Sequence, residues 1–419
     1  MEEFIREQIK DKPINKKKVK ERIITSALSG VAFGLGACLV VGLFLPGIMG
    51  KQNSDKPVNV SEVSEHLEEP SETESETKKN KDKSEEVKKI VEVQSLSIDD
   101  YQDLQSELYY IGGQVNKSIV TVNSVKSDVD WFNNAYESDN QGTGIIVKEE
   151  SSRLLILTEK KALGDSEKIS VTFKDDTLAS AELVKYDGNT NIAIISVNKE
   201  EITSSTLDSI SVAEFGNSST VRNGMIVIAL GSPLGTNYSI LTGNITSTDN
   251  EVTTKDNNYS VLTTDIVASK NGSGVLTDVK GRIVGVVMQD FGISGAENIL
   301  TAVTISDIKP IIQMLMDGKD IPYLGAYVTT VTESIAKDNG IPTGVYIKEV
   351  VMDSPAMEAG LQSGDVITAV NGEAVSTVSA YNKRILALEP GEKYTVTVKR
   401  QGSNGYSKIT CKVKIGILE

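Results

Sequence analysis

A β-branched run meets a turn between residues 225 and 247, which read Met225-Ile-Val-Ile-Ala-Leu-Gly-Ser-Pro-Leu-Gly235-Thr-Asn-Tyr-Ser-Ile-Leu241-Thr-Gly-Asn-Ile-Thr-Ser247. Short β-branched runs bounded by glycine, proline and small polar residues are typical of strands. The run Met225–Ala229 is therefore predicted to be a strand, bounded by turn signals.

The same pattern recurs on both sides of this stretch. Six further short runs have it: Ser118–Val122, Gly144–Val147, Leu154–Leu157, Ile169–Phe173, Ile192–Val197 and Ile283–Val287. Such spacing predicts an all-β barrel or sandwich. Ser97-Ile-Asp-Asp100 predicts the capped start of a helix that continues towards Gly112, and a second helix is expected over Ile305–Met316.

A second, smaller domain is predicted after the break at Asp317-Gly-Lys319. Its expected elements include a helix over Thr377–Leu388, a turn at Glu389-Pro-Gly391 and a strand over Tyr394–Lys399. The chain of 419 residues is long enough for two such domains and additional segments.

Composition narrows the classes of partner and of chemistry. A net charge of -15 argues against nucleic-acid binding, which usually needs a basic face, and favours peptides or proteins as partners. The two cysteines, Cys38 and Cys411, lie at opposite ends of the chain, so neither a disulfide nor a zinc cluster is predicted. No cofactor and no metal site are expected. The single histidine is His66, so any histidine-dependent mechanism must use it.

The N-terminal part predicts a membrane anchor. Residues 23–49 carry no charge and are long enough to cross a bilayer as a helix. The basic tail 1–22 keeps the N-terminus cytoplasmic and places the rest outside the cytoplasm. A cleaved signal peptide is the alternative, but the run is long for one and lacks a clear cleavage site. Residues 50–96, which include His66, are rich in Ser, Glu, Lys, Asp and Thr and predict a disordered linker.

Several motifs between residue 115 and the C-terminus resemble the HtrA (DegP-like) family of serine proteases. They are Gly142-Thr-Gly-Ile-Ile-Val147, Gly231-Ser-Pro-Leu-Gly235, Leu241-Thr-Gly-Asn-Ile-Thr-Ser247, Thr264-Asp265, Asn271-Gly-Ser-Gly274 and Lys280-Gly-Arg-Ile-Val-Gly285. The resemblance implies a trypsin-like double barrel, a homotrimer, and Ser273 at the position of the catalytic nucleophile.

The chain departs from the family pattern at the other catalytic positions. Lys161 stands where the family has its histidine, and Asn191 stands where the family has its aspartate. The family's Gly-Asn-Ser-Gly-Gly becomes Asn271-Gly-Ser-Gly-Val275, which puts the oxyanion region at Asn271 and Gly272 in doubt. We therefore expect an inactive serine site. The alternative is a serine–lysine dyad in which a neutral Lys161 serves as base.

The C-terminal motifs resemble a bacterial PDZ domain. They are Tyr323-Leu-Gly-Ala326, Ser354-Pro-Ala-Met-Glu-Ala-Gly-Leu361, Gly364-Asp-Val-Ile367 and Val370-Asn-Gly372. PDZ domains add a peptide as an extra strand and capture its terminal carboxylate on backbone N–H groups, so the resemblance assigns that role to Tyr323, Leu324, Gly325 and Ala326. On the following helix, Val378, Tyr381 and Ile385 share one face, which would either line the peptide pocket or pack in the core.

The whole sequence predicts five segments: a cytoplasmic tail 1–22, a transmembrane helix 23–49, a linker 50–96, a trypsin-like domain 97–318 and a PDZ domain 319–419. The predicted function is that of a membrane-anchored, extracytoplasmic HtrA-like pseudoprotease. It would bind peptides or unfolded proteins in quality control, sensing or scaffolding. The alternatives are an active serine endopeptidase using Ser273 and Lys161, and a purely structural surface protein.

Overall fold

The structure is a computed structural model that describes residues 97–418, apart from 130–134, 165–167, 293–294 and 296. All of these residues belong to one compact unit, Val91–Glu419. The predicted tail 1–22, membrane helix 23–49 and linker 50–96 lie outside the described residues. Within the described part, no helix combines the length and the apolar character that a membrane crossing requires.

The first element is helix α2, Ile98–Val115, and it begins where the sequence predicts. Ser97 Oγ accepts a hydrogen bond from the Asp100 N–H at 3.2 Å, while the Ser97 N–H donates to the Asp100 carboxylate at 2.7 Å. This reciprocal capping box satisfies N–H groups that a helix start otherwise leaves unpaired. Leu108 and Gly112 are buried on one face of α2, whereas Ile98 is 74% exposed.

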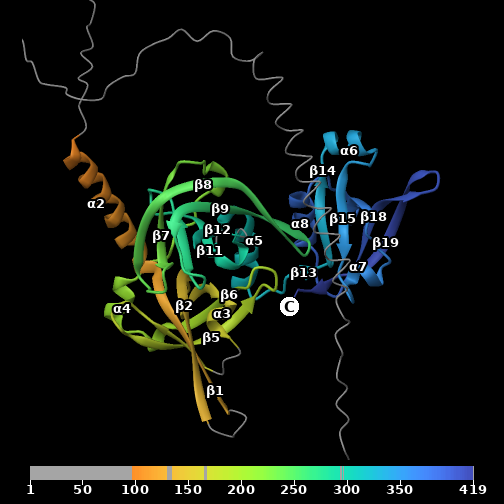
Figure 1. The fold of residues 1–419 in the computed structure, drawn as a ribbon. Coiled ribbons are helices and arrows are strands. Elements are labelled where there is room, and N and C mark those ends of the chain that lie inside the picture. The colour runs from red at the N-terminus through yellow and green to blue at the C-terminus, as the bar shows by residue number, and fades with distance from the viewer. Residues whose placement is uncertain (1–96, 130–134, 165–167, 293–294, 296, 419) are drawn as a thin grey trace, which may run out of the picture. The chain divides into compact units, whose positions relative to one another are not determined.

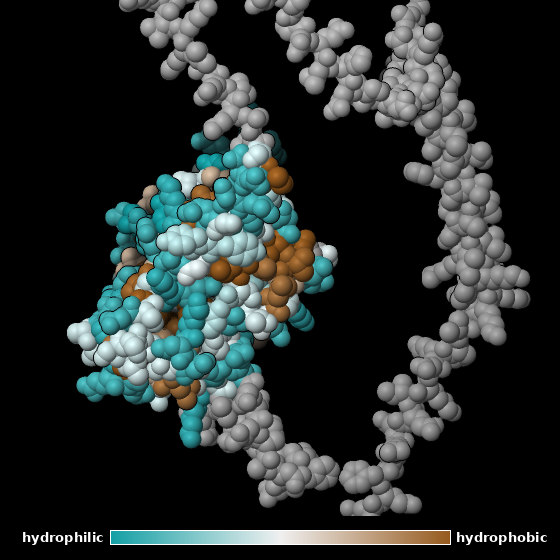
Figure 2. All heavy atoms as spheres, turned by 90° about the vertical axis from the view of Figure 1, so that its left-hand side faces the viewer, coloured by the Kyte–Doolittle hydropathy of each residue, from teal (hydrophilic) through white to brown (hydrophobic). Residues whose placement is uncertain are grey.

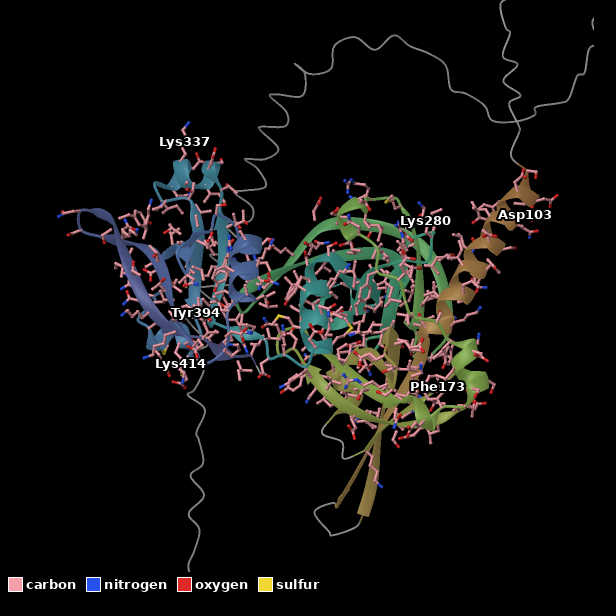
Figure 3. The ribbon with its side chains drawn as sticks, turned by 180° about the vertical axis from the view of Figure 1, so that it is seen from behind. Asp103, Phe173, Lys280, Lys337, Tyr394 and Lys414 are labelled. Atoms are coloured by element: carbon pink, nitrogen blue, oxygen red, sulfur yellow. The ribbon has the colours of Figure 1, made fainter. Side chains whose placement is uncertain are left out.

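Six strands then form the first closed barrel, in the order β1-β2-β3-β6-β5-β4. They are β1 (Ile119–Val129), β2 (Ala135–Glu149), β3 (Arg153–Glu159), β4 (Lys168–Thr172), β5 (Leu178–Tyr186) and β6 (Ile192–Asn198). The short helices α3 (Lys160–Leu163) and α4 (Ser204–Ser209) follow β3 and β6. Phe173, labelled in Figure 3, is buried in the apolar cluster of this barrel.

A second closed barrel has the strand order β10-β11-β12-β9-β8-β7. Its strands are β7 (Ile226–Ser232), β8 (Ser239–Thr254), β9 (Asn257–Val267), β10 (Ser273–Thr277), β11 (Ile283–Met288) and β12 (Ile299–Thr304). Helix α5, Ile305–Met316, coincides with the predicted helix. Leu155 and Leu157 of the first barrel share one apolar cluster with Leu230 and Val275 of the second, which fixes the two barrels against each other.

The remaining residues form the smaller C-terminal domain, whose main sheet has the order β14-β15-β16-β18-β19, with β17 paired to β16 (Figure 1). Its elements are β13 (Pro322–Tyr323), β14 (Ala326–Val331), α6 (Glu333–Asn339), β15 (Gly344–Val350), α7 (Pro355–Glu358), β16 (Val366–Val370), β17 (Glu373–Ala374), α8 (Val378–Ile385), β18 (Lys393–Gly402), β19 (Gly405–Lys414) and β20 (Gly416–Ile417). Strand β14 lies at the end of this order, so one of its edges has no neighbouring strand within the sheet.

The surface follows the usual division between charged and apolar side chains. Lys337 on α6 and Lys414 on β19 point away from the domain (Figure 3). The face shown in Figure 2 is mostly hydrophilic, with apolar side chains gathered in separate patches. The mostly β fold and the barrel architecture predicted from the strand spacing are confirmed.

Candidate functional site

Ser273 is the first residue of β10, and its hydroxyl is engaged with the first barrel. The side chain is 5% exposed. Its Oγ accepts a hydrogen bond from the Thr143 N–H on β2 at 3.2 Å and donates to Thr143 Oγ1 at 3.1 Å. Thr143 Oγ1 in turn donates to Asn237 Oδ1 at 3.1 Å. The Ser273 proton therefore lies in a chain of neutral hydrogen bonds.

Lys161, at the histidine position, belongs to the short helix α3 and forms an ion pair. Its Nζ lies 2.7 Å from Glu159 Oε2. Glu159 is 7% exposed, and burial raises the pKa of its carboxyl, an effect that the Lys161 charge opposes. Glu159 Oε1 has no hydrogen-bond partner among the described residues. The Lys161 amine is thus used to neutralise a buried carboxylate.

Asn191, at the aspartate position, contributes its backbone rather than its side chain. It is exposed and adopts a left-handed conformation with φ of 59°. Its carbonyl accepts from the Lys160 N–H at 2.7 Å, and its N–H donates to the Asp187 carbonyl at 2.9 Å. The buried Asp187 carboxylate accepts from Thr190 Oγ1 at 2.5 Å and from the Thr190 N–H at 3.0 Å. These hydrogen bonds stabilise the loop before β6.

A cavity of about 350 Å³ brings part of the predicted site together. Its lining is mainly polar and consists of Asn140, Gln141, Gly142, Thr143, Thr158, Glu159, Lys161, Ala162, Asn271 and Ser273. The predicted residues Ser273, Lys161 and Asn271 therefore share one cavity, whereas Asn191 and Gly272 are not part of its lining. Thr143 and Glu159, which hold Ser273 and Lys161, were not predicted from the sequence.

The turn before Ser273 closes against the end of β7. The Gly272 N–H donates to the Ser269 carbonyl at 2.9 Å, and a Cβ at Gly272 would lie 2.6 Å from the Pro233 carbonyl oxygen. Asn271 is exposed at the tip of this turn. Because the Gly272 N–H is already bonded to the turn itself, it does not point to an oxyanion in this conformation.

The predicted carboxylate loop of the C-terminal domain binds a carboxylate of the same chain. The N–H groups of Leu324, Gly325 and Ala326 donate to the Asp256 side chain at 2.8, 2.8 and 3.1 Å. Tyr381 Oη donates to Asp256 Oδ1 at 2.7 Å. Burial raises the pKa of Asp256, and these four hydrogen bonds oppose the rise. All four partners are donors, so the ionised carboxylate is the form that satisfies them.

The helix residues predicted beside this loop are part of the domain core. Val378, Tyr381 and Ile385 are at most 5% exposed and lie in one apolar cluster. Core packing accounts for all three positions, and a contribution to a ligand pocket stays a prediction. Burial and the charge of Asp256 raise the pKa of the Tyr381 phenol well above its ordinary value, so the phenol keeps its proton and donates.

Comparison with known proteins agrees with this architecture. Residues 142–286 match the model of a trypsin-like peptidase domain, and residues 322–413 match that of a PDZ domain. The serine protease Do-like HtrB of Bacillus subtilis (strain 168) is 32% identical over 280 residues, which cover 62% of this chain and 59% of that protein. The serine protease Do-like HtrA of the same organism is 29% identical over 289 residues, which cover 64% and 62%.

A solved structure gives the same fold. The HtrA-type protease AlgW with decapeptide has a TM-score of 0.55 and 20% identity, covering 74% of this chain and 98% of that one. The match spans about three fifths of the length of the two Bacillus relatives.

Two closed six-stranded barrels followed by a PDZ sheet define a trypsin-like domain joined to a PDZ domain. With the Bacillus relatives above, this architecture supports an HtrA-like family for the chain.

Proposed function

We propose that this chain is a membrane-anchored, extracytoplasmic HtrA-like protein that recognises peptides through its PDZ domain and does not hydrolyse them. Its role would be quality control, sensing or scaffolding. The observation that carries the inactive assignment is the single histidine, His66, which precedes both barrels in the chain. Serine hydrolysis of the trypsin type needs a base within hydrogen-bond reach of the nucleophile.

The contacts of the two remaining candidates support the same proposal. Ser273 donates its proton to Thr143 Oγ1, and Lys161 is paired with Glu159. A general base must instead accept the proton of the nucleophile, usually over about 2.6–3.2 Å. The second candidate function, a serine–lysine endopeptidase, is favoured by one observation, namely that Ser273 and Lys161 line the same cavity. In the described structure, however, Lys161 pairs with Glu159 and Ser273 is bonded to Thr143.

Peptide recognition is supported by the donors around Gly325. Three successive N–H groups converge on a carboxylate, which is the geometry that captures a peptide C-terminus in the PDZ mode of binding. The related AlgW structure is described as an HtrA-type protease with decapeptide. A purely structural surface protein would not require such a set of converging donors.

The anchor and the topology rest on the sequence alone. The uncharged residues 23–49 would cross the membrane, with the basic tail 1–22 in the cytoplasm and both folded domains outside. The trimer implied by the family resemblance is a further part of the proposal.

Activity measurements test the proposal. The full chain, purified in detergent beside an active HtrA-type protease as positive control, is expected to leave unfolded casein uncleaved above background. A fluorophosphonate probe, which labels activated serines, is expected to leave Ser273 unlabelled. Casein turnover that disappears in Ser273→Ala would overturn the inactive assignment. Labelling that is lost in Lys161→Ala would establish the serine–lysine dyad.

A further inference from the structure

The tip of the β8–β9 hairpin reaches from the second barrel into the PDZ carboxylate loop. Lys255 and Asp256 form this tip, and Asp256 takes a left-handed φ of 59°. The Asp256 side chain is 4% exposed and receives the three loop N–H groups and the Tyr381 hydroxyl. A buried carboxylate is costly unless donors surround it, and here four donors do so.

The backbone of the hairpin tip also pairs with the PDZ sheet. The Asp256 N–H donates to the Ala326 carbonyl at 2.8 Å, and Lys255 forms an antiparallel bridge with Tyr327. Both partners lie on β14, the end strand of the sheet. Asn382 Nδ2 on α8 donates to the Asp256 carbonyl at 3.2 Å. The hairpin therefore makes both contacts that define a PDZ ligand, namely strand pairing at the edge and carboxylate capture in the loop.

On its other side the tip is held by the first barrel. Asn189 Nδ2, in the loop that also contains the predicted Asn191, donates to the Lys255 carbonyl at 2.7 Å. This contact comes from outside the PDZ domain and fixes the hairpin in the position from which Asp256 enters the loop. The PDZ donors are thus occupied by a preformed element of the same chain, whose effective concentration at the site is high.

We propose that Asp256 is an internal competitor for the PDZ carboxylate site, so that a peptide C-terminus binds only when the hairpin tip leaves the loop. The proposal rests on the peptide-binding function proposed above and adds its regulation. The competing ligand is a peptide with a free C-terminal carboxylate and an apolar last residue. Such a peptide offers an apolar terminal side chain in addition to the carboxylate, whereas Asp256 offers the carboxylate alone.

The expected change in peptide affinity follows from the hydrogen bonds that Asp256 makes when the hairpin tip occupies the loop. Hydrogen bonds to a charged group are stronger than neutral ones, and apparent peptide affinity falls in proportion to the fraction of molecules in which the hairpin tip has left the loop. Loss of the Asp256 charge is therefore expected to tighten peptide binding by about 10-fold or more.

The test uses the full chain in detergent with four proteins: wild type, Asp256→Asn, Asp256→Gly and the control Asp249→Asn. Asparagine and glycine both tolerate the positive φ at residue 256, so the turn is retained. Asp249 is an exposed aspartate on the same strand, β8. Calorimetry with ten-residue peptides ending in Val, Leu or Phe, each as free acid and as amide, gives the affinities. Hydrogen exchange of the segment that contains residues 324–326 gives the occupancy of the loop without any peptide.

We expect both Asp256 variants to bind the free-acid peptides about 10-fold more tightly than wild type and Asp249→Asn, and their loop amides to exchange faster. Equal affinity in all four proteins would refute the proposal that Asp256 competes with the peptide, while the peptide-binding function would stand. If no protein binds peptide, faster exchange in both Asp256 variants would sustain the internal occupation and refute the peptide function instead. Unchanged exchange would refute the internal occupation.

Discussion

The serine site and the PDZ loop are both places where backbone N–H groups of an HtrA-like chain are expected to receive a negatively charged oxygen. In the PDZ loop three N–H groups point to one carboxylate. Before Ser273, the Gly272 N–H is bonded to its own turn, and the serine hydroxyl is bonded to Thr143. The three PDZ loop N–H groups thus converge on one carboxylate, whereas the Gly272 N–H is bonded within its own turn.

The two sites also differ in how they treat a buried carboxylate. Asp256 is surrounded by four donors, whereas Glu159 has one ion pair and one oxygen without a partner among the described residues. A fully bonded carboxylate stabilises the element that holds it, while an incompletely bonded one destabilises the fold. Substitutions at the two sites should therefore change the stability of the fold by different amounts, and even in opposite directions.

The largest effect is expected for Gly325→Ala. Gly325 has φ of 96°, and an added Cβ would lie 2.3 Å from Ser354 Cβ. Backbone strain and this clash together should destabilise the PDZ domain by about 3–5 kcal/mol. Hydrogen exchange of the β14 and β16 amides measures this loss.

The matched control is Gly364→Ala, at a glycine with φ of 91° and no heavy atom within 4 Å of the added Cβ. It retains the strain without the clash, so a loss of only about 1–2 kcal/mol is expected. If the two substitutions cost the same, close packing against Ser354 would not be what fixes the carboxylate loop.

Glu159→Gln is expected to have a smaller effect on stability, and to increase it rather than reduce it. Because burial raises the pKa of Glu159 in the folded state, the folded form binds its proton more readily than the unfolded chain does. The contribution of Glu159 to stability is therefore greatest below its unfolded pKa and is lost as the pH rises through the folded pKa. Glutamine removes this loss, so the variant should exceed wild type in stability at neutral pH, by on the order of 1 kcal/mol.

Hydrogen exchange of the β3 and β6 amides, measured from pH 4 to pH 8 with correction for intrinsic exchange, reports the Glu159 effect. The advantage of Glu159→Gln should grow as the pH rises. Glu251→Gln, at an exposed glutamate on β8, is the control and should change little at any pH. A neutral-pH loss of stability in Glu159→Gln would mean that the pair with Lys161 outweighs the cost of burial.

Much of the fold follows from local sequence patterns. Each of the seven β-branched runs matches a strand to within one residue, since a buried strand must fill both faces with branched apolar side chains. Ser118, Phe173 and Met225 lie just outside β1, β4 and β7. Among the strands of the two barrels, β5, β8, β9, β10 and β12 were not predicted. In β8, for example, polar residues such as Asn244, Asp249 and Asn250 weaken the pattern, and pairing with β7 and β9 determines the strand instead.

The candidate site was only partly predictable. Motif positions located Ser273, Lys161 and the loop Tyr323–Ala326, because each belongs to a short local pattern. Asp256 lies in the polar segment Lys255-Asp-Asn-Asn258, which is typical of an ordinary turn. The groups that donate hydrogen bonds to its carboxylate lie 68 to 125 residues later in the chain. A contact of this kind depends on how two folded domains meet, and no local pattern records it.

An effect on stability no larger than that of Glu159→Gln is expected for Ser273→Ala. If Ser273 retained a catalytic arrangement, its hydroxyl would be held in a strained or incompletely bonded state. Instead it makes two neutral hydrogen bonds to Thr143, and its replacement should cost only about 1 kcal/mol in the exchange of β10 amides. Thr143→Val, which removes the hydroxyl that accepts from Ser273, should cost a similar amount. A clear gain of stability in Ser273→Ala alone would reveal strain at the hydroxyl, and with it the trace of a serine site that is still poised for chemistry.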